Sequence, residues 1–385
     1  MTGLQSWLMD LWVNIIETML RLFPFPAKTG LKIIGKPDEN SPVLLTCNFQ
    51  LTVRRVKRAL KEIDCYLLVA NTKGINVWCA ATGGYLNNHS VISVIKTSGI
   101  EDKVNHKKIV LPQLAAPGVE SKVIQKKTSW KVIWGPVDIK DIKEFLKDNF
   151  TKSEKMRKVT FPLKHRIEMA VLWAFPLSLL LTIIWVSFFY EELLALWIQV
   201  WSISLVTFIS YPLYEPILQL EKKQGRNAFF GWSKLLILLF ISSFALLGVV
   251  IYTVIIKEFE PWLFGRWCIF SFIVSLIIVI DLAGTTPNFK SDTHEDKAFS
   301  VVLDEERCKG TGICISVCPR NCFDLDEEKK VVVFNRTNEC VQCGACVVQC
   351  PFDAIQFENQ KGTTLTPEIV REFKLNLSGK RVIRE

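Results

Sequence analysis

The sequence predicts a multi-domain chain that combines α/β, transmembrane and α+β parts. Three observations support this: short apolar runs alternate with helical segments in the first third, four long apolar runs follow, and eight of the twelve cysteines lie between residues 308 and 350. The expected parts, in order, are an amphipathic helix (1–25), a Rossmann-like α/β domain (40–150), a transmembrane domain of four helices (166–284), a small α+β domain (299–360) and a basic tail (361–385).

The four long apolar runs predict membrane-spanning helices. They cover residues 167–190, 193–214, 232–256 and 265–283. Each is close to the ~20 residues that a helix needs to cross a ~30 Å hydrocarbon layer. Buried core helices are the alternative, but the run 235–256 has no charged residue and no polar face, which favours a span.

The distribution of Lys and Arg predicts the orientation. The positively charged connections contain Lys152, Lys155, Arg157, Lys158, Lys164 and Arg166 before the first span, and Lys222, Lys223, Arg226 and Lys234 between the second and third. Such connections are cytoplasmic. Four spans return the chain to the side it left, so we expect a multi-pass protein of the cell (inner) membrane with both soluble domains in the cytoplasm. The net charge of +9 is then explained by topology, and no nucleic-acid motif accompanies it.

Few ionisable residues lie deep within the expected spans. Glu168 and Asp281 are near their cytoplasmic ends. Pumps and ion-coupled carriers usually bury such groups, so the block is interpreted as an anchor, with transport as the alternative. The apolar stripe of residues 4–23 predicts an amphipathic helix that lies on the membrane surface or packs against protein, and the sequence does not choose between the two.

Short apolar runs alternate with helical segments between residues 42 and 150. We expect strands at 43–46, 66–70, 75–80, 108–111, 119–127 and 131–134, and helices at 52–61, 86–98 and 139–148. This order predicts a Rossmann-like sheet whose ligand lies beyond the carboxyl ends of the strands. No GxGxxG follows the first strand, so a nicotinamide or flavin dinucleotide is not indicated.

Cys79 lies in the segment Asn76-Val77-Trp78-Cys79-Ala80-Ala81. From composition alone, a cysteine beside Trp at a strand end is ordinarily a small buried apolar residue. However, this segment, together with residues 44–56 and the Leu-Pro-Gln-Leu-Ala-Ala-Pro-Gly-Val run at 111–119, resembles the corrinoid-binding domain of the mercury-methylating corrinoid proteins. Those proteins are relatives of the corrinoid iron-sulfur protein of the acetyl-CoA pathway.

The resemblance implies a cobalt ligand. In that family the matching segment forms a cap helix under the corrinoid, and its cysteine is the lower axial ligand. Carried over, Cys79 is the catalytic ligand to cobalt. The residues that shape the cap are then Asn76, Val77, Trp78, Ala80 and Ala81. A thiolate donates electron density and would ease methyl departure towards a soft electrophile such as Hg(II). The family segment usually continues with Gly-Lys, whereas Thr82-Gly83 stands here, so substrate and affinity are expected to differ.

The cysteines after residue 300 form an internal repeat with an offset of 32 residues. The matching pairs are Cys308 and Cys340, Cys314 and Cys346, and Cys318-Pro319 and Cys350-Pro351. This is the pattern of a bacterial-type ferredoxin with two clusters, in which each half gives its fourth ligand to the other cluster. A structural zinc site does not need four cysteines followed by Pro in both halves.

If the last cysteine of each half binds the cluster of the other half, then one 4Fe-4S cluster has the ligands Cys318, Cys340, Cys343 and Cys346. The other cluster keeps Cys308, Cys314 and Cys350, because Thr311 stands where Cys343 is expected from the repeat. A hydroxyl is a weak iron ligand, so this site is predicted to hold a 3Fe-4S cluster or a 4Fe-4S cluster with a labile iron. Cys322 is interpreted as a packed thiol beside the clusters, and rescue of the incomplete site is the alternative.

These predictions combine into a membrane-anchored corrinoid methyltransferase fused to a ferredoxin that reduces its cobalt, with methyl transfer from methylcobalt to inorganic Hg(II). A methylfolate-type donor or methyltransferase and a low-potential electron donor are the implied partners. The ferredoxin partner of the mercury-methylating family typically ends in a cysteine pair, which this tail lacks. A corrinoid methyl carrier with another acceptor, in one-carbon metabolism or a metalloid, is therefore one alternative. A membrane electron-transfer protein without corrinoid is another.

Overall fold

The computed structural model describes residues 12–223, 232–257, 259–282, 299–359, 361–376 and 379–382. They divide into two units. One unit contains the described residues up to Phe23 and from Thr160 to Leu282. The other contains Pro24–Val159 and the described residues from Phe299 onward. The α/β region and the cysteine-rich region, separated in sequence by the long apolar helices, therefore fold together.

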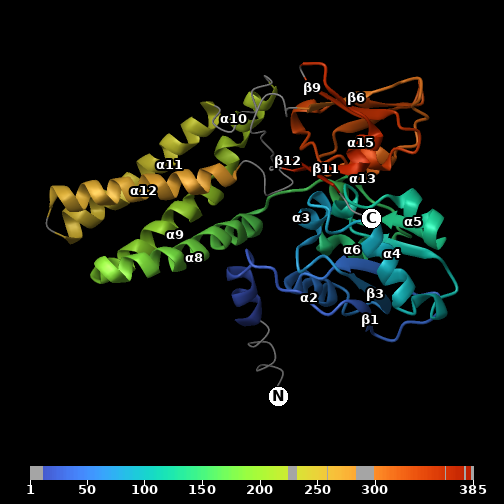
Figure 1. Cartoon of the computed structure of the whole chain (residues 1–385), viewed down its shortest axis with the longest axis horizontal. Helices are drawn as coiled ribbons and strands as arrows, with labels where there is room; N and C mark the ends of the chain where they lie inside the picture. Colours follow the sequence, from blue (N-terminus) through green and yellow to red (C-terminus); the bar gives the residue numbers. More distant parts are fainter. Residues whose placement is uncertain are drawn as a thin grey trace. The chain divides into compact units, whose positions relative to one another are not determined.

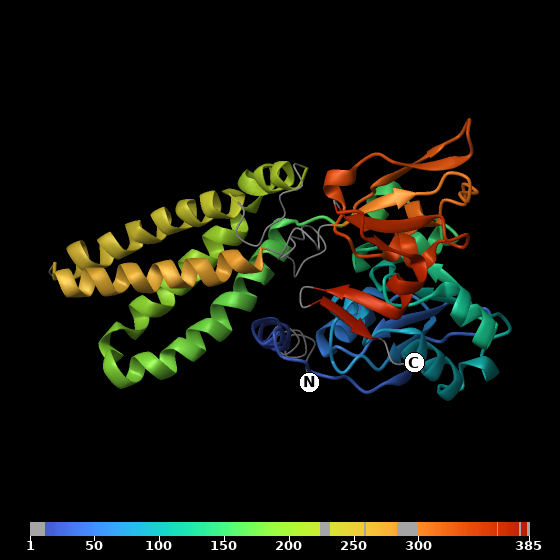
Figure 2. The same ribbon diagram turned by 45° about the horizontal axis from the view of Figure 1, so that its top comes forward.

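The first unit is a bundle of long apolar helices (Figures 1 and 2). Its elements are α8 (Leu163–Phe188), η4 (Tyr190–Glu192), α9 (Leu193–Ile209), α10 (Tyr211–Lys223), α11 (Trp232–Val250), the π-helical η5 (Ile251–Ile256) and α12 (Pro261–Asp281). Four segments are long and apolar enough to cross a membrane: Leu163–Phe188, Tyr190–Ile209, Trp232–Ile255 and Pro261–Ile280. Outward-facing Leu180, Ile183 and Leu194 are exposed, as expected of surfaces that contact lipid.

The second expected span is shorter than predicted. We predicted that it runs to residue 214, but α9 ends at Ile209 and α10 starts afresh at Tyr211. Pro212 has no N–H to donate to the preceding turn, which explains the break. Inside the bundle, Gln199 Nε2 of α9 donates to Ala245 O (2.8 Å) and Ser271 Oγ (2.9 Å). This buried amide ties α9 to α11 and α12.

The amphipathic segment at the start of the chain belongs to the helical unit. Residues 12–19 are helical, and Arg21 Nη1 lies 3.1 Å from Glu168 Oε2 of α8. The segment therefore packs against the bundle, one of the two alternatives that the sequence left open. Trp12 and Ile16 remain exposed, so part of the apolar stripe is still accessible. The predicted stripe residues before Trp12 lie outside the described part.

The second unit contains a five-stranded sheet. Its strands are β1 (Gly30–Ile34), β2 (Val43–Cys47), β3 (Cys65–Ala70), β4 (Lys108–Leu111) and β5 (Lys131–Trp134), in the order β1-β3-β2-β4-β5. β1 is antiparallel to β3, and the other pairs are parallel. The parallel strands have the order β3-β2-β4-β5, which is that of flavodoxin-like sheets and not that of the dinucleotide-binding Rossmann fold. From β2, the chain adds β3 on one side of the sheet and β4 on the other, so the strand order switches between β2 and β4. The edge strand β1 was not predicted from the sequence.

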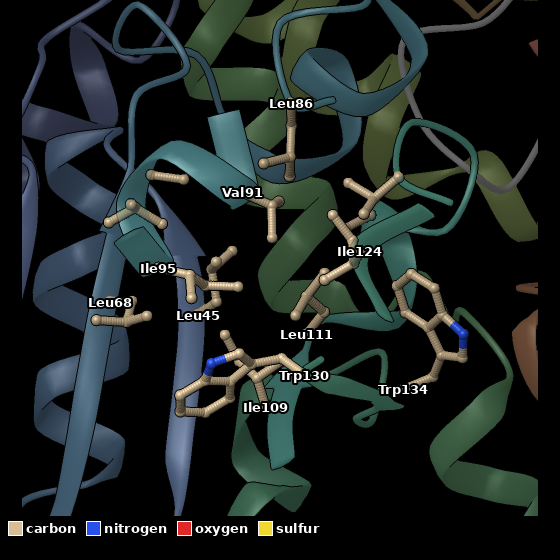
Figure 3. Close-up of a cluster of buried hydrophobic side chains, with 14 of the residues drawn as sticks. Leu45, Leu68, Leu86, Val91, Ile95, Ile109, Leu111, Ile124, Trp130 and Trp134 are labelled. Atoms are coloured by element: carbon tan, nitrogen blue, oxygen red, sulfur yellow. The ribbon is translucent and has the colours of Figure 1, made fainter. Parts of the chain in front are cut away.

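Apolar side chains cover both faces of this sheet. Leu68, Ile95 and Trp130 lie in the cluster on one face (Figure 3), while Leu67, Val69 and Phe145 lie in the cluster on the other. The period of two in β3 sends Leu67 and Leu68 to opposite faces, as expected of a buried parallel strand. The covering helices include α2 (Gln50–Ala59), α4 (Asn88–Thr97), α5 (Ser121–Thr128), η3 (Ile139–Asp141) and α6 (Ile142–Lys147).

Two expected strands are helices. Residues 75–80 contribute to α3 (Val77–Thr82), because the Asn76 side chain accepts a hydrogen bond from Cys79 N (2.9 Å) and caps a helix there. Residues 119–127 contribute to α5, whose start is fixed by Glu120 N donating to Asn88 Oδ1 (2.7 Å). In both cases a polar side chain binds the backbone, an interaction that the apolar pattern does not register.

The cysteine-rich region consists of two copies of one small unit. Its elements are β6 (Phe299–Leu303), α13 (Ile313–Val317), β7 (Phe323–Asp326), β8 (Val331–Phe334), η7 (Thr337–Glu339), α14 (Ala345–Gln349), β9 (Ile355–Asn359) and β10 (Thr364–Leu365). β6 pairs with β9, and β7 with β8. The predicted tail is partly folded: α15 (Pro367–Glu372) is followed by a hairpin of β11 (Phe373–Asn376) and β12 (Gly379–Val382).

Candidate functional site

The carboxyl ends of β2 and β3 are joined by a buried polar network. Asn48 Oδ1 accepts hydrogen bonds from Thr72 N, Thr72 Oγ1 and Gly74 N, each at 2.9 Å. Asn48 and Thr72 are buried, so the network fixes the loop that leads into α3. Sequence reasoning did not single out either residue, although an Asn directly after an apolar strand was a usable signal.

Cys79 lies on α3, in the connection that follows β3, at the carboxyl edge of the sheet. Of the twelve cysteines, Cys79 alone is exposed. Cys47 and Cys65 in the adjoining strands are buried, and burial raises the pKa of the Cys65 thiol to about 12. Only Cys79 therefore combines a soft sulfur donor with access from outside.

The other predicted cap residues divide into two groups. Asn76, Val77 and Trp78 are half-buried, whereas Ala80 and Ala81 are fully buried. A Cβ added at Gly118 would lie 2.9 Å from Ala81 Cα, so the 112–118 loop and α3 are in close contact. Ala80 and Ala81 thus pack α3 onto the protein, while Asn76 begins the helix and Cys79 lies on its exposed side. The backbone of β11 also runs beside α3 (Figure 1).

The predicted cluster ligands line two separate pockets. The four-cysteine pocket is lined by Cys318, Cys340, Cys343 and Cys346, and also by Cys322. The Thr311 pocket is lined by Cys308, Thr311, Cys314 and Cys350. This grouping is the one that the crossed-ligand interpretation expects. The two pockets are similar in size, with about 310 and about 320 Å³ of unfilled space when open solvent is included.

Backbone N–H groups point at several of these sulfurs. Cys322 N donates to Cys318 Sγ and Ala354 N to Cys350 Sγ, both at 3.3 Å. Gln342 N donates to Cys340 Sγ at 3.4 Å. Such donors stabilise thiolates that carry the charge of an iron-sulfur cluster. The donor set and its hydrogen bonding therefore fit iron-sulfur clusters, which would be held by thiols from both halves of the repeat.

Cys322 belongs to the four-cysteine pocket and is absent from the described lining of the Thr311 pocket. Its hydrogen bond with Cys318 raises the pKa of the Cys322 thiol and lowers that of Cys318. Cys322 is therefore a buried S–H donor to neighbouring sulfurs. This placement favours the packed-thiol interpretation over rescue of the incomplete site.

The α/β domain and the ferredoxin-like region meet through two buried glutamines, Gln113 and Gln349. Gln113 Nε2 donates to Cys318 O (3.2 Å), and Gln349 Nε2 donates to Ala116 O (2.8 Å). Sequence reasoning missed both. Gln113 stood out only as a polar residue in an otherwise apolar loop, and nothing in the spacing indicated what it contacts.

Comparisons with known proteins match the α/β region and the cysteine-rich region to two different families. Residues 14–146 match the family model of the CO dehydrogenase/acetyl-CoA synthase delta subunit, and residues 307–354 match that of the 4Fe-4S dicluster domain. Each match covers less than half of the chain. The first residues of the delta-subunit match belong to the helical unit, so family and structural boundaries differ slightly.

Curated relatives match about a third of the chain. The acetyl-CoA decarbonylase/synthase complex subunit gamma of Methanocaldococcus jannaschii is 38% identical over 153 residues, which are 37% of this chain and 31% of the relative. The same subunit of Methanopyrus kandleri is 43% identical over 125 residues (32% and 27%). The corrinoid/iron-sulfur protein large subunit of Moorella thermoacetica is 32% identical over 128 residues (33% and 28%). The chain thus spans less than a third of these relatives.

Proposed function

We propose that this chain is a membrane-anchored, corrinoid-dependent methyltransferase whose own ferredoxin domain supplies the electrons. The observation that carries the proposal is the folding of the exposed Cys79 edge and the two cysteine pockets into one unit. Similarity to a corrinoid/iron-sulfur protein over a third of the chain, with the family match over residues 14–146, supports the cofactor. When bound, a corrinoid supplies a cobalt ion that carries methyl groups between donor and acceptor.

The chain's own residues would divide the work. Cys79 would hold the cobalt through its sulfur, Asn76 keeps the helix that presents Cys79, and Ala80 and Ala81 hold that helix against the protein. The cluster ligands would be seven of the eight cysteines in the two pockets, all but Cys322, with one 4Fe-4S cluster in the four-cysteine pocket and a 3Fe-4S or labile 4Fe-4S cluster in the Thr311 pocket. A methylfolate-type methyl donor and a low-potential electron donor are the proposed partners.

The helical unit is proposed to anchor the protein in the cell membrane with both soluble parts in the cytoplasm. Four helices of sufficient length, apolar exposed surfaces and the positive charges beside the first and third spans support this. The polar groups that bridge the helices, such as Gln199, are bonded to other helices, which suits an anchor.

The lower-ligand role is tested with the full chain, purified in detergent without oxygen and loaded with a corrinoid. We expect Cys79→Ala to change the cobalt absorption and electron paramagnetic resonance spectra. Cys65→Ala, which removes a buried thiol in β3, is the matched control and should leave them unchanged. Wild-type protein that binds iron and sulfide but no corrinoid would instead support a membrane electron-transfer protein.

The proposed methyl acceptor is inorganic Hg(II), on the resemblance of the Asn76–Ala81 segment. A thiolate beneath cobalt favours methyl departure towards a soft electrophile. A second candidate, a methyl carrier in one-carbon metabolism, is favoured by the similarity to complex subunits named for acetyl-CoA and by Thr82-Gly83. Incubation of loaded protein with reductant, methyl donor and Hg(II) separates them: methylmercury supports the first, and its absence from a reducible, methyl-accepting protein supports the second.

A further inference from the structure

The two cysteine pockets differ in their relation to the α/β domain. Of the seven candidate ligands, Cys343 alone packs against the apolar cluster that contains Ala80 and Ala81 of α3. The other six pack in the separate core of the ferredoxin domain. Ala345, which also lines the four-cysteine pocket, belongs to the same cluster as Ala80 and Ala81. The four-cysteine pocket therefore meets the core of the α/β domain through a candidate ligand, whereas the Thr311 pocket meets it through Ile313, which is not one.

Buried polar groups join the α/β domain to the ferredoxin domain beside the four-cysteine pocket. Gln113 is 1% exposed and donates from Nε2 to Arg157 O (2.9 Å) and to Cys318 O (3.2 Å). Lys152 Nζ donates to Gln113 Oε1 (2.8 Å) and to Ser316 O (2.7 Å). Gln113 belongs to η2 (Gln113–Ala115), which is in contact with α3. One side chain thus bonds the backbone of a cluster ligand from the element next to Cys79.

The opposite side of the interface is built from Gln349. This side chain is 3% exposed and donates to Ala116 O (2.8 Å) and Val119 O (2.5 Å), while Ser121 Oγ donates to it (2.9 Å). Near it, Lys122 Nζ donates to Pro351 O at the Thr311 pocket. These contacts hold the segment from Ala116 to Ser121, which connects η2 to α5. The two glutamines are therefore matched in burial and bonding but lie at different pockets.

The two pockets also differ in access from outside. The lining of the four-cysteine pocket is buried except for half-buried Cys340 and Cys343. The rim of the Thr311 pocket includes exposed Lys309, Thr311 and Phe352, the last with 45% exposure. An external electron donor can therefore contact exposed residues at the rim of the Thr311 pocket, whereas no residue that lines the four-cysteine pocket is fully exposed.

We infer that electrons enter at the Thr311 pocket and leave from the four-cysteine pocket, past Cys343 and Gln113, towards the Cys79 helix. This inference rests on the proposed function and adds a direction to it. The thiols of the Thr311 pocket would hold the group that takes one electron from a low-potential donor, and the thiols of the four-cysteine pocket would hold the group that passes this electron on. One electron would leave the donor for each electron that reaches a corrinoid held by Cys79, and no proton would be transferred. Gln113 is a positioning residue that holds the four-cysteine pocket, from which the electron leaves, against the α/β domain.

The test compares Gln113→Leu with Gln349→Leu in the full chain, loaded with a corrinoid and mixed rapidly with dithionite. Cluster bleaching and the corrinoid absorption band are followed separately. We expect Gln113→Leu to slow corrinoid reduction about tenfold without slowing cluster reduction. The reason is that the four-cysteine pocket is then no longer held in position against the α/β domain. Gln349→Leu should change corrinoid reduction much less. Gln113→Asn, which keeps a shorter amide, should fall between wild type and Gln113→Leu.

A second measurement needs no corrinoid. In a redox titration followed by electron paramagnetic resonance, Gln113→Leu should lower the midpoint potential of the cluster in the four-cysteine pocket alone, since an N–H dipole directed at a ligand's backbone is lost. Gln349→Leu should not shift that potential. Equal slowing by the two variants, a larger effect of Gln349→Leu, or a shift confined to the other cluster would overturn the inference. Wild-type protein that binds no corrinoid would instead defeat the proposed function.

Discussion

The two halves of the ferredoxin repeat have similar backbones but offer different chemistry. α13 and α14 each have five residues, and each follows a glycine with positive φ, Gly312 at 68° and Gly344 at 79°. Yet one pocket has four thiols for a cluster and a buried fifth, and the other has three thiols and Thr311. The backbone that forms a cluster pocket is therefore maintained by the fold and does not depend on a complete ligand set.

The difference extends to what surrounds each pocket. The four-cysteine pocket meets the α/β domain through Cys343 and has no exposed lining residue, while the Thr311 pocket has an exposed rim. In this chain the incomplete ligand set is found at the pocket with the exposed rim, and the complete set at the pocket whose Cys343 packs against the α/β domain. Four predictions test this contrast.

Loss of a buried thiol should have the largest effect. Cys346→Ala should eliminate the cluster in the four-cysteine pocket, whereas Cys314→Ala, at the matching position, should eliminate the cluster in the Thr311 pocket. Each should remove about half of the bound iron, because each pocket is proposed to hold one cluster of three or four irons. Iron analysis and electron paramagnetic resonance give the readout. Retention of all iron in either variant would contradict the ligand assignment.

Completing the Thr311 pocket should have the next largest effect. Thr311→Cys supplies the thiolate that the repeat lacks, so bound iron should increase by about one per chain if a 3Fe-4S cluster is present, and the oxidised 3Fe-4S signal should disappear. Thr311→Ser keeps a hydroxyl and is the control, with no expected change. If Thr311→Cys behaves as wild type in iron content and in resistance to iron chelators, the pocket already holds four firmly bound irons.

The pH dependence of stability should be specific to the Gln113 side of the interface. Burial lowers the pKa of Lys152 from 10.5 to about 7. Between these values the unfolded chain binds a proton that the folded chain excludes, so the unfolding free energy should fall as pH falls from 10.5 to 7, by at most about 1.4 kcal/mol per pH unit.

Thermal unfolding of wild type, Lys152→Gln and Lys122→Gln at pH 7 and pH 9 measures this dependence. Lys152→Gln should reduce the pH dependence, and Lys122→Gln, which changes an exposed lysine on the Gln349 side, should preserve it. An equal pH dependence in all three proteins would show that the Lys152 ammonium is not penalised in the interface.

Replacing Cys322 should have the smallest effect. Its match in the second half of the repeat is Ala354, so Cys322→Ala makes the two halves alike at this position. We expect full iron content, a loss of about 1 kcal/mol in stability from the small cavity, and a slightly lower potential of the cluster in the four-cysteine pocket. Loss of an iron atom from this variant would instead identify Cys322 as a ligand.

Sequence reasoning predicted the parts of the molecule that depend on local pattern. Four spans, most strands of the sheet and the grouping of the cluster cysteines follow from apolar run length, period and spacing. It placed strands at 75–80 and 119–127, where the side chains of Asn76 and Asn88 accept backbone hydrogen bonds at the starts of helices. It also missed β1, a short edge strand, and treated the ferredoxin as a tethered partner, although the structure shows it packed against the α/β domain.

The sequence by itself determined which chemistry is available: one cysteine in a corrinoid-type segment, seven cysteines spaced for two clusters, and apolar helices long enough for a bilayer. These depend on residue type and local spacing, which the sequence states directly. Only the tertiary structure decided that Cys79 is exposed while Cys47 and Cys65 are buried, and that Gln113 meets Cys318 across 205 residues of chain. Burial and long-range contacts arise from how distant segments pack, and no local pattern encodes them.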